Sequence, residues 1–243
     1  MFDQSVQDKI QIISHSGIRI NGEKIIYIDP VQIKDAPHDA DLILFTHPHL
    51  DHFSPADVKK LLKDSTVIAA PKSMAGLCKL LLHKNITPLL PAQDTELCGI
   101  PVKTVAAYNT AKPFHAKPFK WLGYVLTIGE TKVYISGDTD ITDECMNVEC
   151  DIALLPVGGG YTIGPVQAAE LANKLSPHTV IPIHYGKLLG GEGAADEFKK
   201  RLNENIHADI RPSAYSSIMI SVYLKAGMLL VAGALLGALA YWI

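Results

Sequence analysis

The histidine-rich stretch HPHLDH, residues 47–52, follows directly on the apolar run DLILFT, residues 41–46. A continuous apolar run of this length is typical of a strand that is buried on both faces of its sheet. Three imidazoles and a carboxylate then lie within six residues: His47, His49, Asp51 and His52. Such side chains suit zinc or another borderline divalent ion. The sequence therefore predicts a sheet scaffold with a metal site at the end of a buried strand.

Two later loops place chemistry-bearing residues in a similar position. Gly137 and Asp138 follow an expected strand at residues 132–135, and His184 follows another at residues 179–183. Gly137 allows the backbone to turn, and the two oxygens of Asp138 could bridge two cations. Each loop alone is a weak signal, because a lone histidine after a strand is more often packed or exposed. Together with residues 47–52 they predict one site where several strands end.

The remaining pattern predicts short strands with helices interleaved in both halves of the chain. We expect strands at residues 10–14, 17–20, 24–29, 41–46, 66–70, 102–108, 124–128, 132–135, 151–155 and 179–183, with a hairpin turn at Asn21-Gly22. We expect helices after the N-cap Ser54 and at residues 72–83, 165–175 and 195–203. This order indicates two sheets with helices outside them. One domain, residues 1–212, followed by a tail, residues 213–243, is the simplest division.

Bulk composition excludes some classes of function. A net charge of −3, without any cluster of lysine or arginine, does not indicate nucleic-acid binding. The four cysteines contain no C-x-x-C pair and predict free thiols in a reducing compartment: Cys78, Cys98, Cys145 and Cys150. The first residues do not resemble a secretory signal.

The tail contains eighteen consecutive residues without a charge, AGMLLVAGALLGALAYWI at residues 226–243. As a helix this segment would be about 27 Å long, close to the thickness of the hydrocarbon core of a bilayer. Lys225, Tyr241 and Trp242 flank it as interfacial anchors would. We expect a transmembrane anchor with the domain in the cytoplasm. The alternatives are a buried helix of the domain or a helix used in homo-oligomerisation.

The motifs THPHLDH at residues 46–52, GDTD at 137–140 and HYG at 184–186 resemble those of the metallo-β-lactamase superfamily. The closest resemblance is to its small metal-dependent hydrolases, which include the L-ascorbate phosphate lactonases and the N-acyl-phosphatidylethanolamine phospholipases. Other matching pieces are SHSG at 14–17, IDP at 28–30, ALLPVGG at 153–159 and IPIHYG at 181–186. The resemblance covers about residues 10–190. It implies an α/β (α+β) fold, a four-layer αββα sandwich with a two-metal site at one edge of the sheets.

The resemblance also implies a set of metal ligands. His47 and His49 would bind the first metal, and Asp51 and His52 the second. Asp138 would bridge the two ions, and His184 would complete the second site.

The family needs a third histidine for the first metal, and here the sequence is ambiguous. Asn109 follows the expected strand directly, where many relatives have the histidine. His115, in KPFHAK at residues 112–117, is the nearby candidate and resembles the Phe-His-Pro-Lys stretch of one branch. If His115 is not a ligand, the protein would bind a single ion.

Four further residues are candidates for a supporting role or for contact with substrate. The resemblance places His15 and Asp29 near the metals without ligating them, and Asp29 could orient a ligand histidine. His15 could equally be a hydrogen-bonded structural histidine. We expect Asp140 to hydrogen-bond its loop rather than approach the metals. Tyr161 could reach the mouth of the site, although aromatic residues in turns more often pack.

These features predict a metal-dependent hydrolase in which a metal-activated water attacks an ester, lactone or phosphodiester. The cofactors would be two divalent ions, zinc first, with manganese or iron as alternatives. Asp51 and Asp138 are the candidate catalytic residues, and the substrate would be a small or lipid-derived molecule. One alternative is a non-catalytic metal-binding or sensing module on the same fold. Another, a di-iron redox protein, would need an electron donor, and no flavin domain is visible in the sequence.

Overall fold

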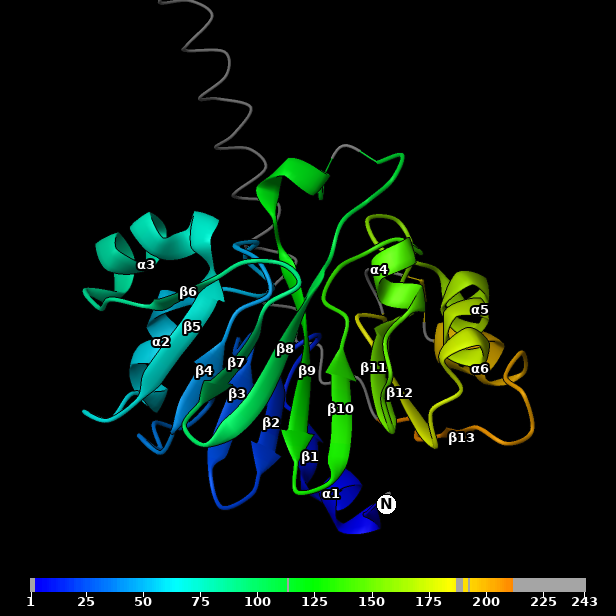
Figure 1. Ribbon diagram of the computed structural model, residues 1–243, viewed down its shortest axis with the longest axis horizontal. Coiled ribbons are helices and arrows are strands. Elements are labelled where there is room, and N and C mark those ends of the chain that lie inside the picture. Colours follow the sequence, from blue (N-terminus) through cyan, green and yellow to red (C-terminus); the bar gives the residue numbers. More distant parts are fainter. Residues whose placement is uncertain (1–2, 113, 187–189, 192, 212–243) are drawn as a thin grey trace, which may run out of the picture.

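The structure is a computed structural model that describes residues 3–112, 114–186, 190–191 and 193–211. Two mixed β-sheets form its centre (Figure 1). The N-terminal sheet has the strand order β1 (Ile10–Ile12), β2 (Ile18–Asn21), β3 (Ile25–Ile28), β4 (Leu42–Leu44), β5 (Val67–Pro71) and β6 (Thr87–Leu89). Strands β1 to β3 are antiparallel, whereas β3 to β6 run parallel.

In the C-terminal sheet, seven strands lie side by side in sequence order, from β7 at one edge to β13 at the other. Its strands are β7 (Asp94–Leu97), β8 (Ile100–Ala106), β9 (Leu122–Ile128), β10 (Thr131–Ile135), β11 (Ile152–Pro156), β12 (Thr179–Ile183) and β13 (His207–Ala208). Strands β7 to β10 pair antiparallel and β10 to β13 pair parallel. The carboxyl ends of β10 and β12 therefore lie at the same edge of the sheet.

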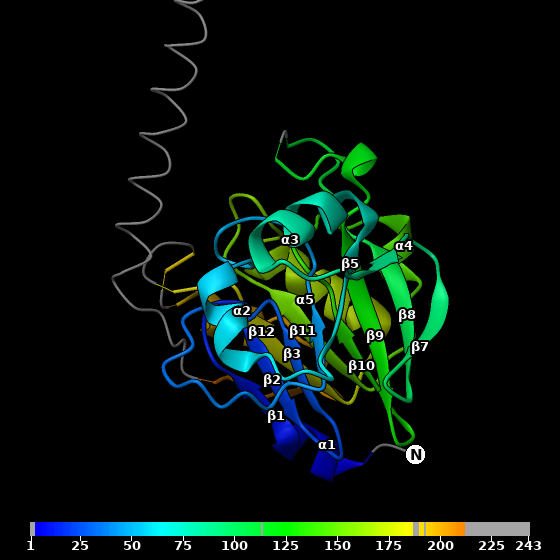
Figure 2. The same cartoon turned by 90° about the vertical axis from the view of Figure 1, so that its left-hand side faces the viewer.

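Helices cover the outer face of each sheet, as the views in Figures 1 and 2 show. On the N-terminal sheet lie α2 (Pro55–Leu61) and α3 (Ala75–Leu82), and on the C-terminal sheet α4 (Asp143–Met146), α5 (Pro165–Leu175) and α6 (Ala194–Lys199). The shorter pieces are α1 (Gln4–Lys9), η1 (Lys72–Met74) and η2 (Lys117–Phe119). The predicted αββα sandwich is confirmed.

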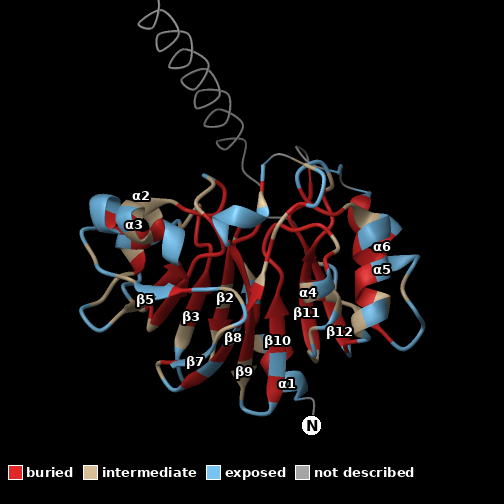
Figure 3. Ribbon diagram, turned by 45° about the horizontal axis from the view of Figure 1, so that its top comes forward, coloured by how far each residue is buried: buried red, intermediate tan, exposed pale blue. Residues whose placement is uncertain are grey.

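Strand β4 shows why the apolar run before the histidines is continuous. Successive side chains of a strand point to opposite faces of the sheet. Leu42 and Leu44 pack into the core between the two sheets, while Ile43 and Phe45 pack under α2 and α3. All four are fully buried, and Figure 3 shows the strands as the most buried part of the molecule. Both faces of β4 thus need apolar side chains.

Several predicted boundaries were wrong. The strand expected at 102–108 occupies Ile100–Ala106. The helix expected at 72–83 begins with the 3₁₀ turn η1, because the amide of Ala75 bonds the oxygen of Lys72. The helix expected at 195–203 ends at Lys199, because the amides of Arg201 and Leu202 bond carbonyls three residues back. Elements α1, β6 and α4 were not predicted; each is at most six residues long and too short for a clear period.

The four cysteines are free, as predicted, and Cys78 and Cys145 are buried. Within the described residues, no helix has both the length and the apolar character that crossing a membrane requires. The expected anchor at residues 226–243 lies outside the described residues, as does the rest of the tail from residue 212.

Candidate metal centre

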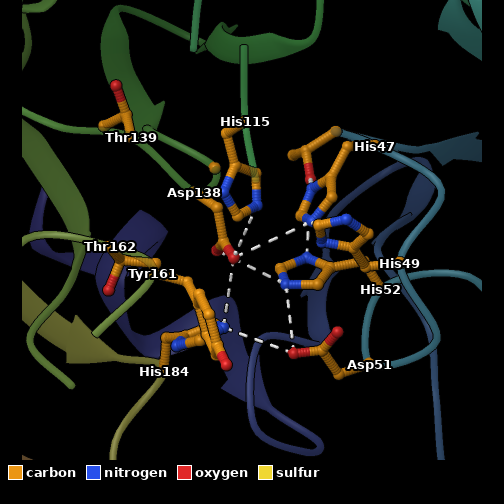
Figure 4. Close-up of polar contacts among 12 residues, drawn as sticks. His47, His49, Asp51, His52, His115, Asp138, Thr139, Tyr161, Thr162 and His184 are labelled. Carbon is orange, nitrogen blue, oxygen red and sulfur yellow. Dashed lines mark hydrogen bonds and ion pairs between the residues drawn. The ribbon is translucent and has the colours of Figure 1, made fainter. Parts of the chain in front are cut away.

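The candidate ligands reach one edge of the two sheets from four loops. Residues 47–52 follow β4, Asp138 follows β10, His184 follows β12, and His115 lies in the connection from β8 to β9. The structure brings all seven predicted ligands into one cluster, drawn in Figure 4. Six of them are buried, and His49 is half-buried.

Asp138 lies between two groups of imidazoles. Its Oδ2 atom is 3.3 Å from Nε2 of His115 and 3.8 Å from Nε2 of His47. On the other side, Oδ2 is 3.3 Å from Nε2 of His184, and Oδ1 is 3.4 Å from Nε2 of His52. Two of the four close groups of ligand atoms share Asp138: His47, His49, His115 and Asp138, and His52, Asp138 and His184. The other two are His15, Asp51 and His184, and Asp29, His47 and His52.

Asp51 adds a second carboxylate to one side of this arrangement. Its Oδ2 atom is 3.3 Å from Nε2 of His184 and 3.6 Å from Nε2 of His52. Figure 4 shows Asp51 on the side of the cluster where His52 and His184 lie. Asp51 thus lies with His52 and His184, the residues with which the resemblance groups it.

The donor atoms fit a cation. The Nε2 atoms of His52, His115 and His184 are buried and make no hydrogen bond, although each lies 3.3–3.4 Å from a carboxylate oxygen. Burying a polar nitrogen without a partner costs free energy. A divalent ion bound among these atoms would satisfy them, and imidazole and carboxylate are suitable ligands for zinc, manganese or iron.

The charges within the cluster also fit a bound cation. Burial by itself would raise the pKa of Asp138, but the imidazoles of His184 and His52 hold it well below its usual value. Burial likewise opposes a charge on His184, but the carboxylates of Asp138 and Asp51 outweigh it and raise the pKa of His184 to about 9. In the absence of a metal, protons on these imidazoles balance the buried carboxylates. The cluster therefore favours bound positive charge.

His47 and His49 are in a different electrostatic state. Burial, together with neighbouring imidazoles, holds the pKa of His47 well below its usual value and lowers that of His49 to about 4. Both rings are therefore neutral near pH 7, and the neutral imidazole is the form that binds a metal.

Asp29 holds His52 in place. It directly follows β3, is buried, and has a left-handed backbone conformation with φ 46°. Its Oδ2 atom lies 2.7 Å from Nδ1 of His52, while its oxygens accept bonds from the amide and hydroxyl of Thr46. A proton on Nδ1 leaves Nε2 of His52 free to face the cluster. This contact is the orienting role expected for Asp29.

His115 is supported by the residue that occupies the position of the missing histidine. Oδ1 of Asn109 is 3.0 Å from Nδ1 of His115, and the amide of Asn109 bonds the backbone oxygen of His115. The side-chain amide of Asn109 donates to the backbone oxygen of Tyr161. No local pattern indicates this role, because it depends on a pairing within an irregular loop.

Asp140 points to its loop rather than to the cluster. It accepts a bond of 2.5 Å from Nζ of Lys112 and one of 2.9 Å from the amide of Thr110. Lys112 also donates to the backbone oxygen of Thr162. Lys112 was not predicted, and it ties the His115 loop to the loop after β10.

The other supporting residues lie at the cluster or its border. His15 is buried, with its ring 4.0 Å from that of His184. Tyr161 is largely exposed and packs against Phe114 with the ring centroids 4.5 Å apart. Trp121, which was not predicted, lies 5.0 Å from the rings of both His47 and His49. The other four histidines belong to no close ligand group in the described chain: His38, His83, His178 and His207.

A cavity of about 960 Å³ lies against β8 and β9. Tyr108, Lys117 and Trp121 form part of its wall, but none of the seven candidate ligands does. Trp121 thus contacts both this cavity and the histidine cluster.

Comparison with known proteins gives consistent matches. A family model described as a β-lactamase superfamily domain matches residues 9–184, a range that contains every candidate ligand. A UPF0173 metal-dependent hydrolase of Thermococcus onnurineus is 31% identical over 211 residues, with 81% of this chain and 92% of the relative covered.

Two solved structures are also similar. A protein of Parabacteroides distasonis, assigned as a metal-dependent hydrolase, is 30% identical with a TM-score of 0.69, and the match covers 83% of this chain and 91% of that one. The metallo hydrolase Igni18 of Ignicoccus hospitalis has a TM-score of 0.69 at 20% identity, covering 84% and 94%. At that identity the second match shows the fold alone.

Proposed function

Because the chain belongs to the β-lactamase superfamily and is a metal-dependent hydrolase within it, we propose that it cleaves an ester, a lactone or a phosphodiester at a two-ion site. The observation that carries this proposal is the position of Asp138 between two groups of buried imidazoles. A carboxylate in this place can contact two cations at once.

In this proposal the chain's own residues divide into two sets. His47, His49 and His115 hold one ion, and Asp51, His52 and His184 hold the other. Asp138 would contact both, and its carboxylate could accept the proton that a water molecule loses. Bound divalent ions, zinc first with manganese or iron as alternatives, supply polarisation of the substrate's oxygen and a lower pKa for water.

The buried walls of the cluster have their own part in this chemistry. Trp121 covers one side of His47 and His49, and Phe45 and Phe53 pack beneath the histidine loop. Bulk water is thereby kept from that side, and charge interactions inside the cluster are strengthened. Asp29 and Asn109 fix the ring orientation of His52 and His115 before any ion arrives.

The test combines metal analysis with an activity panel. The purified protein should carry about two equivalents of zinc, manganese or iron. His49→Ala should lose both bound metal and turnover, whereas His83→Ala, at an exposed position outside the cluster, should keep both. Full activity of a metal-free sample would overturn the proposal. Bound metal without turnover of any ester, lactone or phosphodiester would instead favour a metal-binding or sensing module.

We also propose that residues 226–243 attach the domain to a membrane, which would bring a lipid-derived substrate within reach. The support is the eighteen-residue uncharged sequence with Lys225 before it. The full-length protein should sediment with membranes, and a version truncated after Ala214 should stay in solution. If the full-length protein also stays in solution without detergent, the tail serves the fold or an oligomer interface instead.

A further inference from the structure

Exposed aromatic side chains gather at the metal-site end of the molecule. In the part of the chain that the structure describes, three aromatic residues are largely exposed: Phe114, Phe119 and Tyr161, at 49%, 46% and 46%. All three are connected to the cluster by sequence or by contact. Aromatic rings left in water are unfavourable, and a group of them commonly marks a binding site.

Phe114 and Tyr161 form a pair beside His115. Phe114 directly precedes His115 in the sequence, and its ring meets that of Tyr161 edge to face at 4.5 Å. The backbone oxygen of Tyr161 accepts the side-chain amide of Asn109, which also contacts His115. Tyr161 is drawn with the cluster in Figure 4. The pair is thus fixed to the same support as the third histidine.

Phe119 and Leu50 lie beside the other histidines. Phe119 stacks at 4.9 Å on Trp121, which contacts His47 and His49. Leu50 lies between His49 and Asp51 in the sequence and is 44% exposed. We refer to Leu50, Phe114, Phe119 and Tyr161 as the apolar rim.

The two lysines that flank Phe114 in the sequence, Lys112 and Lys117, are each paired. Lys112 bonds Asp140, and Lys117 bonds Glu144 and the hydroxyl of Tyr108. Neither lysine therefore offers an unpaired positive charge to a phosphate group. An uncharged substrate fits these surroundings better than a phosphodiester.

We propose that the substrate is a neutral carboxylic ester or lactone with an alkyl chain or aryl ring next to the scissile bond, and that the apolar rim binds this group. Ligand sites usually combine apolar walls with a few polar groups that do the chemistry, and here the rim supplies the walls. The inference rests on the proposed function, because the rim borders the hydrolytic site.

The reaction balances with water as the second substrate. The water oxygen forms a bond to the carbonyl carbon, and the bond from that carbon to the ester oxygen breaks. The ester oxygen leaves with a proton as the alcohol, and the remaining fragment is the carboxylic acid. In a lactone both products stay in one molecule.

The test uses the metal-loaded full-length protein and 4-nitrophenyl esters from acetate to octanoate, which share one leaving group. We expect kcat/KM to rise by about tenfold or more along the series, chiefly through KM, because added methylenes find apolar contacts. Tyr161→Ala and Phe114→Ala should flatten this rise, and Tyr161→Phe should retain it. Leu80→Ala is the matched control, since Leu80 is 69% exposed on α3, away from the rim.

A second readout separates the rim from the catalytic proposal. Binding of acetate and octanoate to the metal-loaded protein is measured by calorimetry, with metal content checked for each variant. Tighter binding of octanoate that Tyr161→Ala removes, in a protein that cleaves no ester, lactone or phosphodiester of the activity panel, would support the rim and overturn the proposed hydrolysis. Hydrolysis with the same kcat/KM for every ester, in wild type and rim variants alike, would overturn the rim. If the protein neither binds octanoate more tightly than acetate nor cleaves any ester, lactone or phosphodiester, both proposals are overturned.

Discussion

His115, the candidate third histidine, reaches the cluster from a position other than the one at which the resemblance expects a ligand. His115 lies six positions after Asn109, yet its Nε2 atom is 3.3 Å from Asp138. Asn109 accounts for this position, because it fixes Nδ1 of the ring with its side chain and the backbone with its amide. Asn109, at the position where the resemblance expects a histidine, thus supports His115 instead.

This arrangement makes Asn109→Ala informative. Without Oδ1 of Asn109, the ring of His115 can rotate or change tautomer, and its Nε2 atom no longer faces Asp138 reliably. Loss of such a supporting hydrogen bond typically lowers metal affinity by about 10- to 100-fold. Competition with a chelator would measure this loss. Asn147→Ala is the control, because Asn147 is exposed and its side-chain amide donates to the backbone oxygen of Asp143, outside the cluster. Equal affinities in the two variants would contradict the role of Asn109.

Single residues also show what the sequence could and could not predict. His47, His49, Asp51 and His52 were predictable because their motif is dense and its chemistry is specific. The roles of Asn109, Lys112 and Trp121 were not, because each is defined by contacts with side chains or carbonyls in other loops. Such contacts have no local pattern, so only the folded chain reveals them.

At the scale of elements, the site depends on how strands end. Asp29 and His184 follow β3 and β12 with φ angles of 46° and 55°, and Gly137 follows β10 with a φ of 64°. Left-handed backbone is costly for residues other than glycine and is concentrated at functional sites. These three turns direct side chains into the cluster instead of continuing the strands.

Gly137 allows this to be tested. A Cβ atom there would lie 3.0 Å from the oxygen of Leu122 and 3.2 Å from Cβ of Thr46, the residue that supports Asp29. We expect Gly137→Ala to lower the free energy of unfolding by about 1–3 kcal/mol and to weaken metal retention. Gly129→Ala is the matched control, because Gly129 has a φ of 61° and no atom near the added Cβ. If both variants lose the same stability and keep their metal, close packing at Gly137 is unimportant.

The length of an element decided how well it was predicted. Strand β4 and helix α5 were clear, because β4 is apolar on both faces and the eleven residues of α5 begin with proline at the first position. Helix α1 has six residues, and its cap, Asp3 bonding the amide of Ser5, is the only local signal for it within the described residues. Short elements owe their conformation to packing against the sheets, which the sequence pattern does not express.

At the scale of the whole molecule, the cluster of candidate ligands is a buried group of charges at one edge of the two sheets. The carboxylates of Asp51 and Asp138 are buried with the imidazoles of His52 and His184. Their charges must balance for the folded state to be stable. The negative charges of the carboxylates can be balanced in two ways. Either the imidazoles carry protons, or metal cations bind in place of those protons.

Metal-free protein should therefore lose stability as the pH rises from about 6.5 to 9. Asp138 and Asp51 raise the pKa of His184 from 6.5 to about 9, so its stabilising proton is fully present below about 6.5 and is lost as the pH rises through 9. Those carboxylates and Asp29 also hold the pKa of His52 well above its usual value, against the effect of burial. His47 and His49 do not titrate in this window, because burial lowers their pKa values below it.

Metal should reverse this dependence. Cations compete with protons for the same nitrogens, so their binding strengthens as the pH rises, and bound ligand stabilises the folded state by about 4 kcal/mol at a thousandfold excess over Kd. Melting temperatures at pH 6, 7.5 and 9 should thus fall for the metal-free protein and stay level or rise for the metal-loaded one. If the metal-free protein does not lose stability over this range, protons on His52 and His184 are not what balances the buried carboxylates. The site would then be kept stable by some other charge, and the fit of a divalent ion to this cluster would lose its electrostatic argument.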